Sequence, residues 1–415
     1  MVDLENQEAD IVNIEGWLKV FQEDFSQGRF VRKKKSKSLF LQVGISLESS
    51  DLIAMKIREP GLDTTCEFLL KGENFTILAK NCSIQHRYGR EIEISIGYFI
   101  YSSLDFKSLS KISIQWINLF CSEKSYLQEK NEQIYLSEKR CPCGEKDGQG
   151  FKIAYHFPKD ELVDHLDGAI DEMDRMIIFC RLYYQYYLNV ESFEFSDTKG
   201  RKYTLHLNDH VYRDDFNNNR LRPKFSQEKA PAIYEKFRRL EDCFGNWIFA
   251  MHSMEKDRFY DNKIRWAVTG LEVYVRWVLR NRLKEAEKDY PDLIEILSED
   301  ADVELRRKLS YILNLDFIKT YYIDRYKTTY YNLAGSKRSR KKFIQDSIEC
   351  RNGLVHLKED YHLDLSKDSN WELYTILNRL NYLLFYKELD LEQKELENQL
   401  YHWFDLYNRM FKKRA

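Results

Sequence analysis

The segment Glu349–His356, which reads ECRNGLVH, brings together residue types that could hold a phosphate and move a proton beside it. Arg351 carries a permanent, planar positive charge that can bind two phosphate oxygens. His356 titrates near neutral pH, so its imidazole can accept and donate a proton in one reaction. On a helix, residues 351 and 356 lie about 140° apart and about 7.5 Å along the axis. They can therefore flank one groove, and Asn352 lies one turn before His356 on the same side.

The spacing of Arg351 and His356 carries no weight by itself, because an Arg-x4-His pair is expected by chance in a chain of this length. A second pair, Arg201 and His206, has the same spacing. It belongs to an alternating segment, and residues five apart on a strand point to opposite faces. The asparagine directly after Arg351 makes the first pair rarer. A purely structural alternative stays open, in which Arg351 pairs with a buried carboxylate and His356 is a core histidine.

Two cysteines in the segment Cys141-Pro-Cys143-Gly supply half of a zinc knuckle. A tetrahedral zinc site needs four ligands, usually as two close pairs. The sequence offers no second close pair, and the nearest other candidates are His156 and His165. We therefore interpret the two cysteines as free thiols in a turn, and we expect neither a metal site nor another cofactor.

The basic segment 319–342 is the second place suited to phosphate contact. It contains eight lysines and arginines, whereas Asp324 is its one acidic residue. Aromatic residues within a basic segment favour nucleic-acid binding, because charge holds the backbone and rings stack on bases. The alternative is a solvated loop whose tyrosines belong to the core. The interleaved tyrosines are Tyr321, Tyr322, Tyr326, Tyr330 and Tyr331. The strip predicted to contact nucleic-acid phosphates consists of Lys337, Arg338, Arg340, Lys341 and Lys342.

The elements that must position these residues change type near the middle of the chain. Between about residues 38 and 207 the dominant period is two, which is typical of half-buried antiparallel strands. One helix is expected in this part, from Leu162 to about Leu188, with a hairpin around Asp197–Gly200. From residue 232 onward apolar residues recur with a period of 3.6 and indicate six helices, of which the fourth contains residues 349–356.

The sequence therefore predicts an α+β protein with a β-rich antiparallel N-terminal domain, residues 1–225, and an all-α helical-bundle domain, residues 232–415. Residues 208–231 are polar, include three consecutive asparagines and are predicted to form the linker.

The composition excludes several classes of protein. The formal net charge of −2 over 415 residues is unlike that of a globally basic nucleic-acid coat, so any anion site must be local. With 16 glycines and 6 prolines, the chain is neither collagen-like nor disordered. The acidic N-terminus lacks the pattern of a signal peptide, and no run of 18 apolar residues exists. We expect a cytoplasmic protein with no membrane contact, whose eight cysteines are reduced.

The segment Arg351-Asn-Gly-Leu-Val-His356 resembles the R-N-x-x-x-H signature of the HEPN superfamily, and like that signature it lies late in a helical domain. Leu271–Arg276 looks like an earlier HEPN helix, in which an acidic residue, here Glu272, often faces the motif. The β-rich N-terminal half makes the whole chain similar to the ApeA-type anti-phage proteins. Residues 73–82 resemble an early strand pair of their N-terminal domain, and Asn246-Trp247 also fits. Gly353 departs from a regular motif helix, because glycine costs up to ~1 kcal/mol there.

The resemblance implies a metal-independent endoribonuclease that acts in abortive infection and attacks a phosphate with the RNA 2′-OH. His356 would transfer protons, Arg351 would stabilise the phosphorane, and Asn352 and Glu272 would complete the site. Two protomers would join their motif helices into one composite site, so a homodimer or higher homo-oligomer is expected. RNA, with tRNA as one class, would be the substrate, and a phage-derived trigger would act at the N-terminal domain.

Other functions remain open at this stage. The helical domain could be a non-catalytic HEPN module that binds RNA or protein, with Arg351 and His356 in structural roles. The chain could also be a toxin that a partner protein neutralises. Glu272 has its own structural alternative, an ion pair with Arg276 one turn later.

Overall fold

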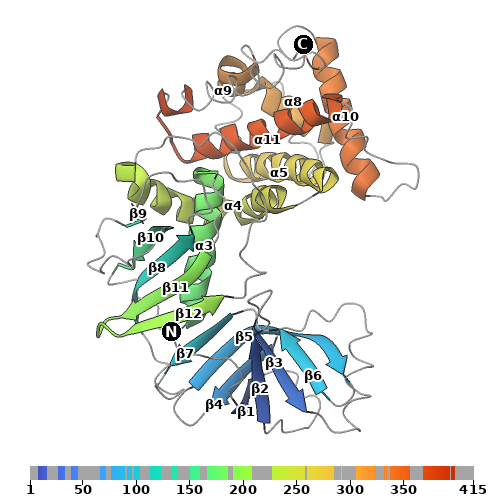
Figure 1. Cartoon of the computed structure of the whole chain (residues 1–415). Coiled ribbons are helices and arrows are strands. Elements are labelled where there is room, and N and C mark those ends of the chain that lie inside the picture. The colour runs from blue at the N-terminus through green and yellow to red at the C-terminus, as the bar shows by residue number, and fades with distance from the viewer. Residues whose placement is uncertain are drawn as a thin grey trace. The chain divides into compact units, whose positions relative to one another are not determined.

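The structure of the protein is a computed structural model. The described residues are 8–15, 27–32, 39–44, 66–71, 76–88, 91–95, 98–102, 113–122, 133–137, 150–158, 166–185, 190–207, 227–257, 259–284, 291, 305–323, 331, 333, 337–355, 368–392 and 394–397. They form an α+β protein in which strands dominate the N-terminal half and helices the C-terminal half (Figure 1).

The chain divides into two compact units. One contains residues 1–177 and 187–217, and the other contains residues 178–186 and 218–415. The predicted domain 1–225 therefore differs from the first unit in residues 178–186 and in its C-terminal limit. Residues 227–231 of the predicted linker belong to helices, whereas residues 208–226 lie outside the described residues.

The first unit is built on strands that pair into one sheet. The order of the strands is β4-β1-β2-β3-β6-β5-β7-β12-β11-β8-β10-β9, and β4 also pairs with β5, so six strands close into a ring. All pairs are antiparallel except β9 with β10, which is parallel and corrects the expectation of a purely antiparallel domain. The strands are β1 (Glu8–Glu15), β2 (Gln27–Arg32), β3 (Leu39–Gly44), β4 (Cys66–Lys71), β5 (Thr76–Tyr88), β6 (Glu91–Ser95), β7 (Tyr98–Ser102), β8 (Ile114–Ser122), β9 (Gln133–Tyr135), β10 (Gly150–His156), β11 (Val190–Asp197) and β12 (Lys202–Leu207).

The hairpin between β11 and β12 forms where the sequence predicted it. Gly200 adopts a φ of +75°, which glycine reaches without steric cost. The Asp197 carboxylate accepts hydrogen bonds from the backbone N–H groups of Lys199 and Arg201, at 3.0 and 2.8 Å. Burial raises the pKa of the Asp197 carboxyl, but the hydrogen bonds and the charge of Arg201 outweigh it and leave the pKa below its ordinary value. The turn is therefore stabilised by an ionised carboxylate.

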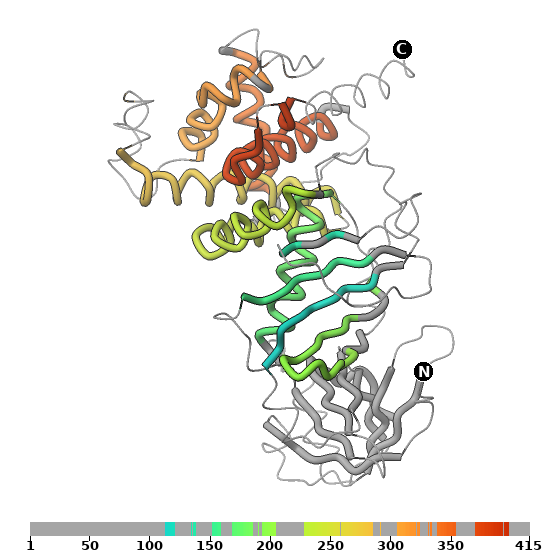
Figure 2. Tube along the Cα trace, turned by 90° about the vertical axis from the view of Figure 1, so that its left-hand side faces the viewer, coloured from blue at the N-terminus to red at the C-terminus, as the bar shows by residue number. Residues whose placement is uncertain are grey.

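Helix α3 (Leu166–Tyr183) confirms the helix predicted within the β-rich part, and it runs alongside the strands β8, β11 and β12 (Figures 1 and 2). Its last residues, from 178 onward, belong to the helical unit. There Arg181 lies within 3.2 Å of the ring nitrogens of His252, and burial together with the Arg181 charge lowers the pKa of His252 to about 3. His252 is therefore neutral at physiological pH.

The described elements of the second unit are all helical, apart from short connections. They are η2 (Gln227–Lys229), α4 (Ala230–Lys256), α5 (Tyr260–Asn281), α8 (Leu305–Asn314), α9 (Asp316–Ile318), η3 (Lys319–Ile323), α10 (Lys337–Val355) and α11 (Asp368–Glu388). The first five predicted helices correspond to α4, α5, α8, α10 and α11. For the sixth, only residues 394–397 are described, as a single helical turn.

Helix α5 is the centre of the helical unit, because it packs against α4, α8, α10 and α11. Asn381 of α11 ties this packing together. Its Nδ2 donates to the carbonyls of Ala267 and Leu377, each at 2.9 Å, and its Oδ1 accepts from Trp247 Nε1 at 3.3 Å. Gly270 of α5 makes room for this side chain, since a Cβ there would lie 2.7 Å from Asn381 Oδ1. The glycine thus permits a buried polar contact between three helices.

We expect Gly270→Ala to destabilise the protein, although alanine favours a helix by about 1 kcal/mol over glycine. The added methyl group displaces the Asn381 amide, and overpacking of this kind costs about 1–3 kcal/mol in addition to any hydrogen bond that it breaks. Urea unfolding of the full chain measures the difference. Gly245→Ala is the control, because Gly245 is an exposed helical glycine with nothing within 4 Å of the added Cβ. A stabilised Gly270→Ala variant would contradict the packing described here.

Candidate functional site

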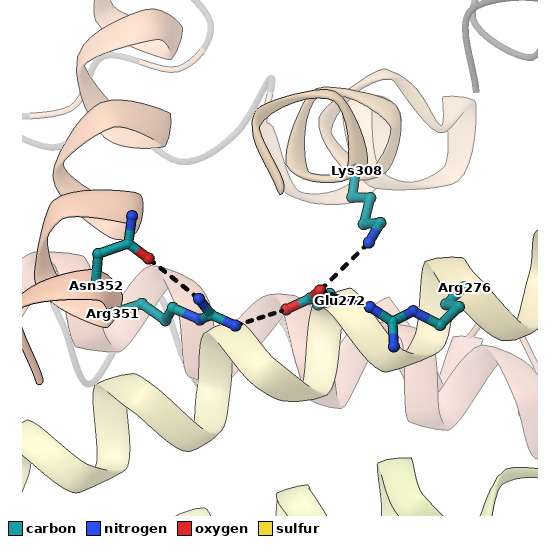
Figure 3. A network of polar contacts seen from close by, with 5 residues as sticks. All are labelled: Glu272, Arg276, Lys308, Arg351 and Asn352. Atoms are coloured by element: carbon teal, nitrogen blue, oxygen red, sulfur yellow. Dashed lines mark hydrogen bonds and ion pairs between the residues drawn. The ribbon is translucent and has the colours of Figure 1, made fainter. Parts of the chain in front are cut away.

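Three positively charged side chains surround the carboxylate of Glu272, which α5 contributes (Figure 3). Arg276 lies one turn later on the same helix, Lys308 comes from α8, and Arg351 comes from α10. Asn352 adjoins the group, because its Oδ1 accepts a hydrogen bond from Arg351 Nη1 at 3.1 Å. These five residues form the Glu272 cluster.

The three cations contact the Glu272 carboxylate through different oxygens and at different distances. Arg276 Nη2 and Lys308 Nζ both contact Glu272 Oε1, at 3.0 and 3.2 Å. Arg351 Nη2 alone faces Oε2, and its distance of 3.4 Å exceeds the 2.7–2.9 Å that is usual for a charge-assisted hydrogen bond. Arg351 is therefore the cation that Glu272 holds least closely.

Burial makes this cluster electrostatically unusual. The side chain of Lys308 is 3% exposed and that of Glu272 is 13% exposed, whereas Arg351 retains 28%. Three positive charges against one negative charge leave the cluster with a surplus of +2. The Nε atoms of Arg276 and Arg351 are also buried and have no hydrogen-bond partner among the described residues. Surplus charge at a partly exposed arginine suits the binding of an anion such as phosphate.

Helical spacing explains how the cluster forms. Glu272 and Arg276 lie at the edge of the buried face of α5, one turn apart. Lys308 lies on the apolar face of α8, where its neighbours Leu309 and Ile312 are buried. A lysine within an apolar helical stripe needs a carboxylate partner, because an unpaired buried charge is costly. This pattern is the signal that could have revealed Lys308, which the sequence-based prediction of the site missed.

The family comparisons find no relative. No family model, curated protein or solved structure matches the chain. The resemblance to HEPN proteins therefore stays a prediction from the motif residues of the sequence.

The structure brings together three of the four residues proposed for catalysis, namely Arg351, Asn352 and Glu272. Helix α10 carries the first two, and Gly353 is buried within it. His356 lies outside the described residues, directly after the last described residue of α10. The ion pair of Glu272 with Arg276, given above as the structural alternative, is also present. Glu272 thus contacts the motif arginine and also forms the bridge along α5.

The strip proposed for RNA binding begins α10, and its members differ in their surroundings. Arg338 and Lys341 are exposed. Arg340 Nε donates to the Leu333 carbonyl at 2.7 Å, and Lys342 pairs with Asp346 at 2.5 Å. The side chain of Lys337 lies outside the described residues. Arg338 and Lys341 are therefore the members best placed to contact a phosphate.

The expectation that the interleaved tyrosines stack on bases is wrong for two of them. Tyr322 and Tyr331 are each 1% exposed, and the Tyr331 hydroxyl donates to Asp346 at 2.6 Å. They belong to the core of the helical unit, as the alternative interpretation of the segment predicted. The side chains of Tyr321, Tyr326 and Tyr330 lie outside the described residues.

Cys141, Cys143 and His165 also lie outside the described residues, so the structure does not place the half zinc knuckle. Within the described ranges, no three His, Cys, Asp or Glu side chains gather as a metal ion would require. In the same ranges, no helix combines the length and the apolar character needed to cross a membrane.

Proposed function

We propose that the chain is a metal-independent endoribonuclease of a bacterial anti-phage system, which cleaves RNA by attack of a 2′-OH on the adjacent phosphate. The observation that carries the proposal is the position of Arg351, the motif arginine, in a cluster with surplus positive charge. Its guanidinium is partly exposed and lies 3.4 Å from Glu272, at the long end of an ion-pair contact. A phosphate oxygen can therefore bind to Arg351 without first breaking a close ion pair.

The chemistry assigned to each residue follows from its side chain. His356 accepts the proton of the attacking 2′-OH, because imidazole titrates near neutral pH. Arg351 stabilises the additional negative charge of the phosphorane. Asn352 orients Arg351 through the hydrogen bond between them, and Glu272 holds Arg351 against α5. In a composite site of two protomers, the His356 of the second protomer protonates the leaving 5′-oxygen. The products are a 2′,3′-cyclic phosphate and a 5′-hydroxyl.

Incubation of the purified full-length chain with total RNA in excess EDTA tests this proposal. We expect cleavage, and mapping of the new ends should show cyclic phosphates and 5′-hydroxyls. Cleavage that stops in EDTA and returns with magnesium would reject the mechanism. RNA binding without any cleavage would favour the second candidate, a non-catalytic RNA-binding module, which the ion pair of Arg351 with Glu272 also supports.

The strip at the start of α10 should make a measurable electrostatic contribution to RNA binding. Substituting Arg338 or Lys341 by glutamine should flatten the dependence of log K on log salt by about 0.7 for each phosphate of single-stranded RNA that the variant no longer neutralises. Arg340→Gln is the matched control within the same strip, because the Leu333 carbonyl already binds its guanidinium. Equal salt slopes for all three variants and the wild type would show that the strip is only solvated.

The helical domain should form a dimer, because a composite site requires two motif helices related by two-fold symmetry. Sedimentation velocity of the full chain at micromolar concentration should show a dimer or a multiple of it. Specific activity should fall on dilution as the dimer dissociates. A monomer that cleaves RNA at an undiminished rate would contradict the shared site.

A further inference from the structure

Helices α4 and α5 present aromatic side chains on the outside of the helical unit. Phe249 of α4 is 59% exposed. Its ring meets that of Trp266 of α5 edge to face, with centroids 5.7 Å apart. The guanidinium of Arg265 lies over the Trp266 ring, 5.1 Å from its centroid. The three side chains, called here the Phe249 platform, combine an exposed ring with a planar cation.

We infer that the Phe249 platform is a subsite that stacks an unpaired base of a single-stranded RNA substrate. Bases that are not paired stack on aromatic rings and on arginine planes, and nearby positive charge holds their phosphates. An exposed phenylalanine beside a tryptophan–arginine pair offers both an aromatic ring for stacking and a positive charge for a phosphate. The inference rests on the proposed function, because it assigns the platform to the same RNA that Arg351 would contact.

The position of the platform along α5 supports this assignment. Arg265 and Glu272 are seven residues apart, which places them on the same face of the helix. At 1.5 Å per residue, the separation is about 10 Å along the axis. One strand of a stacked nucleic acid advances about 3.4 Å per phosphate, so Arg265, the cation of the platform, lies about three nucleotides from Glu272 along the axis of α5. A short stretch of single strand can therefore span the two.

The charges along this face of α5 favour a polyanion. Arg265, Arg276 and Arg280 follow one another at helical spacing, and the carboxylates on the same face are Asp261 and Glu272. Glu272 is already paired with Arg276, Lys308 and Arg351. Arg265 lies on the platform side of Glu272, whereas Arg276 and Arg280 lie on the far side, so this face of α5 carries three arginines against two carboxylates.

The experiment uses the full-length chain and a labelled 12-nucleotide oligoadenylate with 2′-O-methyl groups, which binds but lacks the nucleophile for cleavage. Phe249→Ala and Trp266→Ala should each weaken binding by about 5- to 150-fold, which corresponds to ~1–3 kcal/mol per stacked base. Phe249→Tyr should retain binding, because it keeps a ring of the same shape. An abasic ribose-phosphate of equal length should bind all these variants alike. Phe317→Ala is the matched control, since Phe317 is also a partly exposed ring beside a cation, Lys387.

Three outcomes would overturn the inference. The first is an unchanged affinity of Phe249→Ala for oligoadenylate, and the second is an equal reduction of its affinity for the abasic strand. The third is dissociation of an oligomer by Phe249→Ala in sedimentation, which would assign the face to a second copy.

Cleavage of unmodified RNA separates this inference from the proposed function. Base-dependent binding by a wild type that never cleaves RNA would support the platform and reject the nuclease. Cleavage with the same KM in wild type and Phe249→Ala would support the nuclease and reject the platform.

Discussion

Replacing His356 by alanine should reduce RNA cleavage by about 10²–10⁴-fold, which is the usual contribution of a general acid or base. The loss should appear in kcat, because the imidazole acts on a proton in the transition state. Added imidazole should restore part of the activity of the variant, whereas a merely structural histidine would not be rescued in this way. Full activity in a folded His356→Ala protein would reject the catalytic assignment, and an unfolded variant that imidazole does not rescue would favour a core histidine.

Arg351→Ala should reduce RNA cleavage to a similar extent, but for a different reason. Removing one group that stabilises developing charge costs about 10²–10³-fold in rate. Arg351→Lys should recover little, because an ammonium ion cannot hold two phosphate oxygens in a plane. Arg239→Ala is the control, since Arg239 is an exposed arginine of α4 and lies outside the cluster. The variants should remain folded, because Arg351 is partly exposed.

Glu272→Ala should lower the free energy of unfolding by about 3–5 kcal/mol, which is typical when one partner of a buried ion pair is removed. The reason is Lys308, whose ammonium is nearly buried and whose described ion-pair partner is Glu272. Arg276 and Arg351 reach solvent and can reorient, but Lys308 cannot do so without leaving the packing of α8. Urea denaturation of the full chain gives the measurement.

A second substitution separates the charge effect from a general loss of packing. Lys308→Met in the Glu272→Ala background should recover much of the stability, because an apolar side chain of similar length replaces the unpaired ammonium. Glu392→Ala is the control, because it removes an exposed partner of Lys229 and should change stability little. If Glu272→Ala and Glu392→Ala destabilise the protein equally, the cluster contributes nothing beyond a surface ion pair.

Local sequence patterns were enough to locate most of the regular elements. Alternation marked β10 and β12, and a glycine at the right place marked the hairpin that joins β11 to β12. A period of 3.6 marked α4, α5, α8, α10 and α11, and it placed the segment around Arg351 on α10. These features depend on neighbours a few residues away, so a single sequence contains the information.

The patterns failed where partners lie far apart in the chain. Nothing local shows that Lys308 meets Glu272 across 36 residues, or that Arg351 meets Glu272 across 79. The packing of the helices also determines two further features. These are the burial of Tyr322 and Tyr331 and the hydrogen bond from Arg340 to the Leu333 carbonyl. Periodicity identifies the face that a helix buries but not the helix that covers it. Local spacing was enough to pair Glu272 with Arg276, but tertiary packing determined that the same carboxylate would also meet Lys308 and Arg351, because the shared core of α5, α8 and α10 brings them within contact distance.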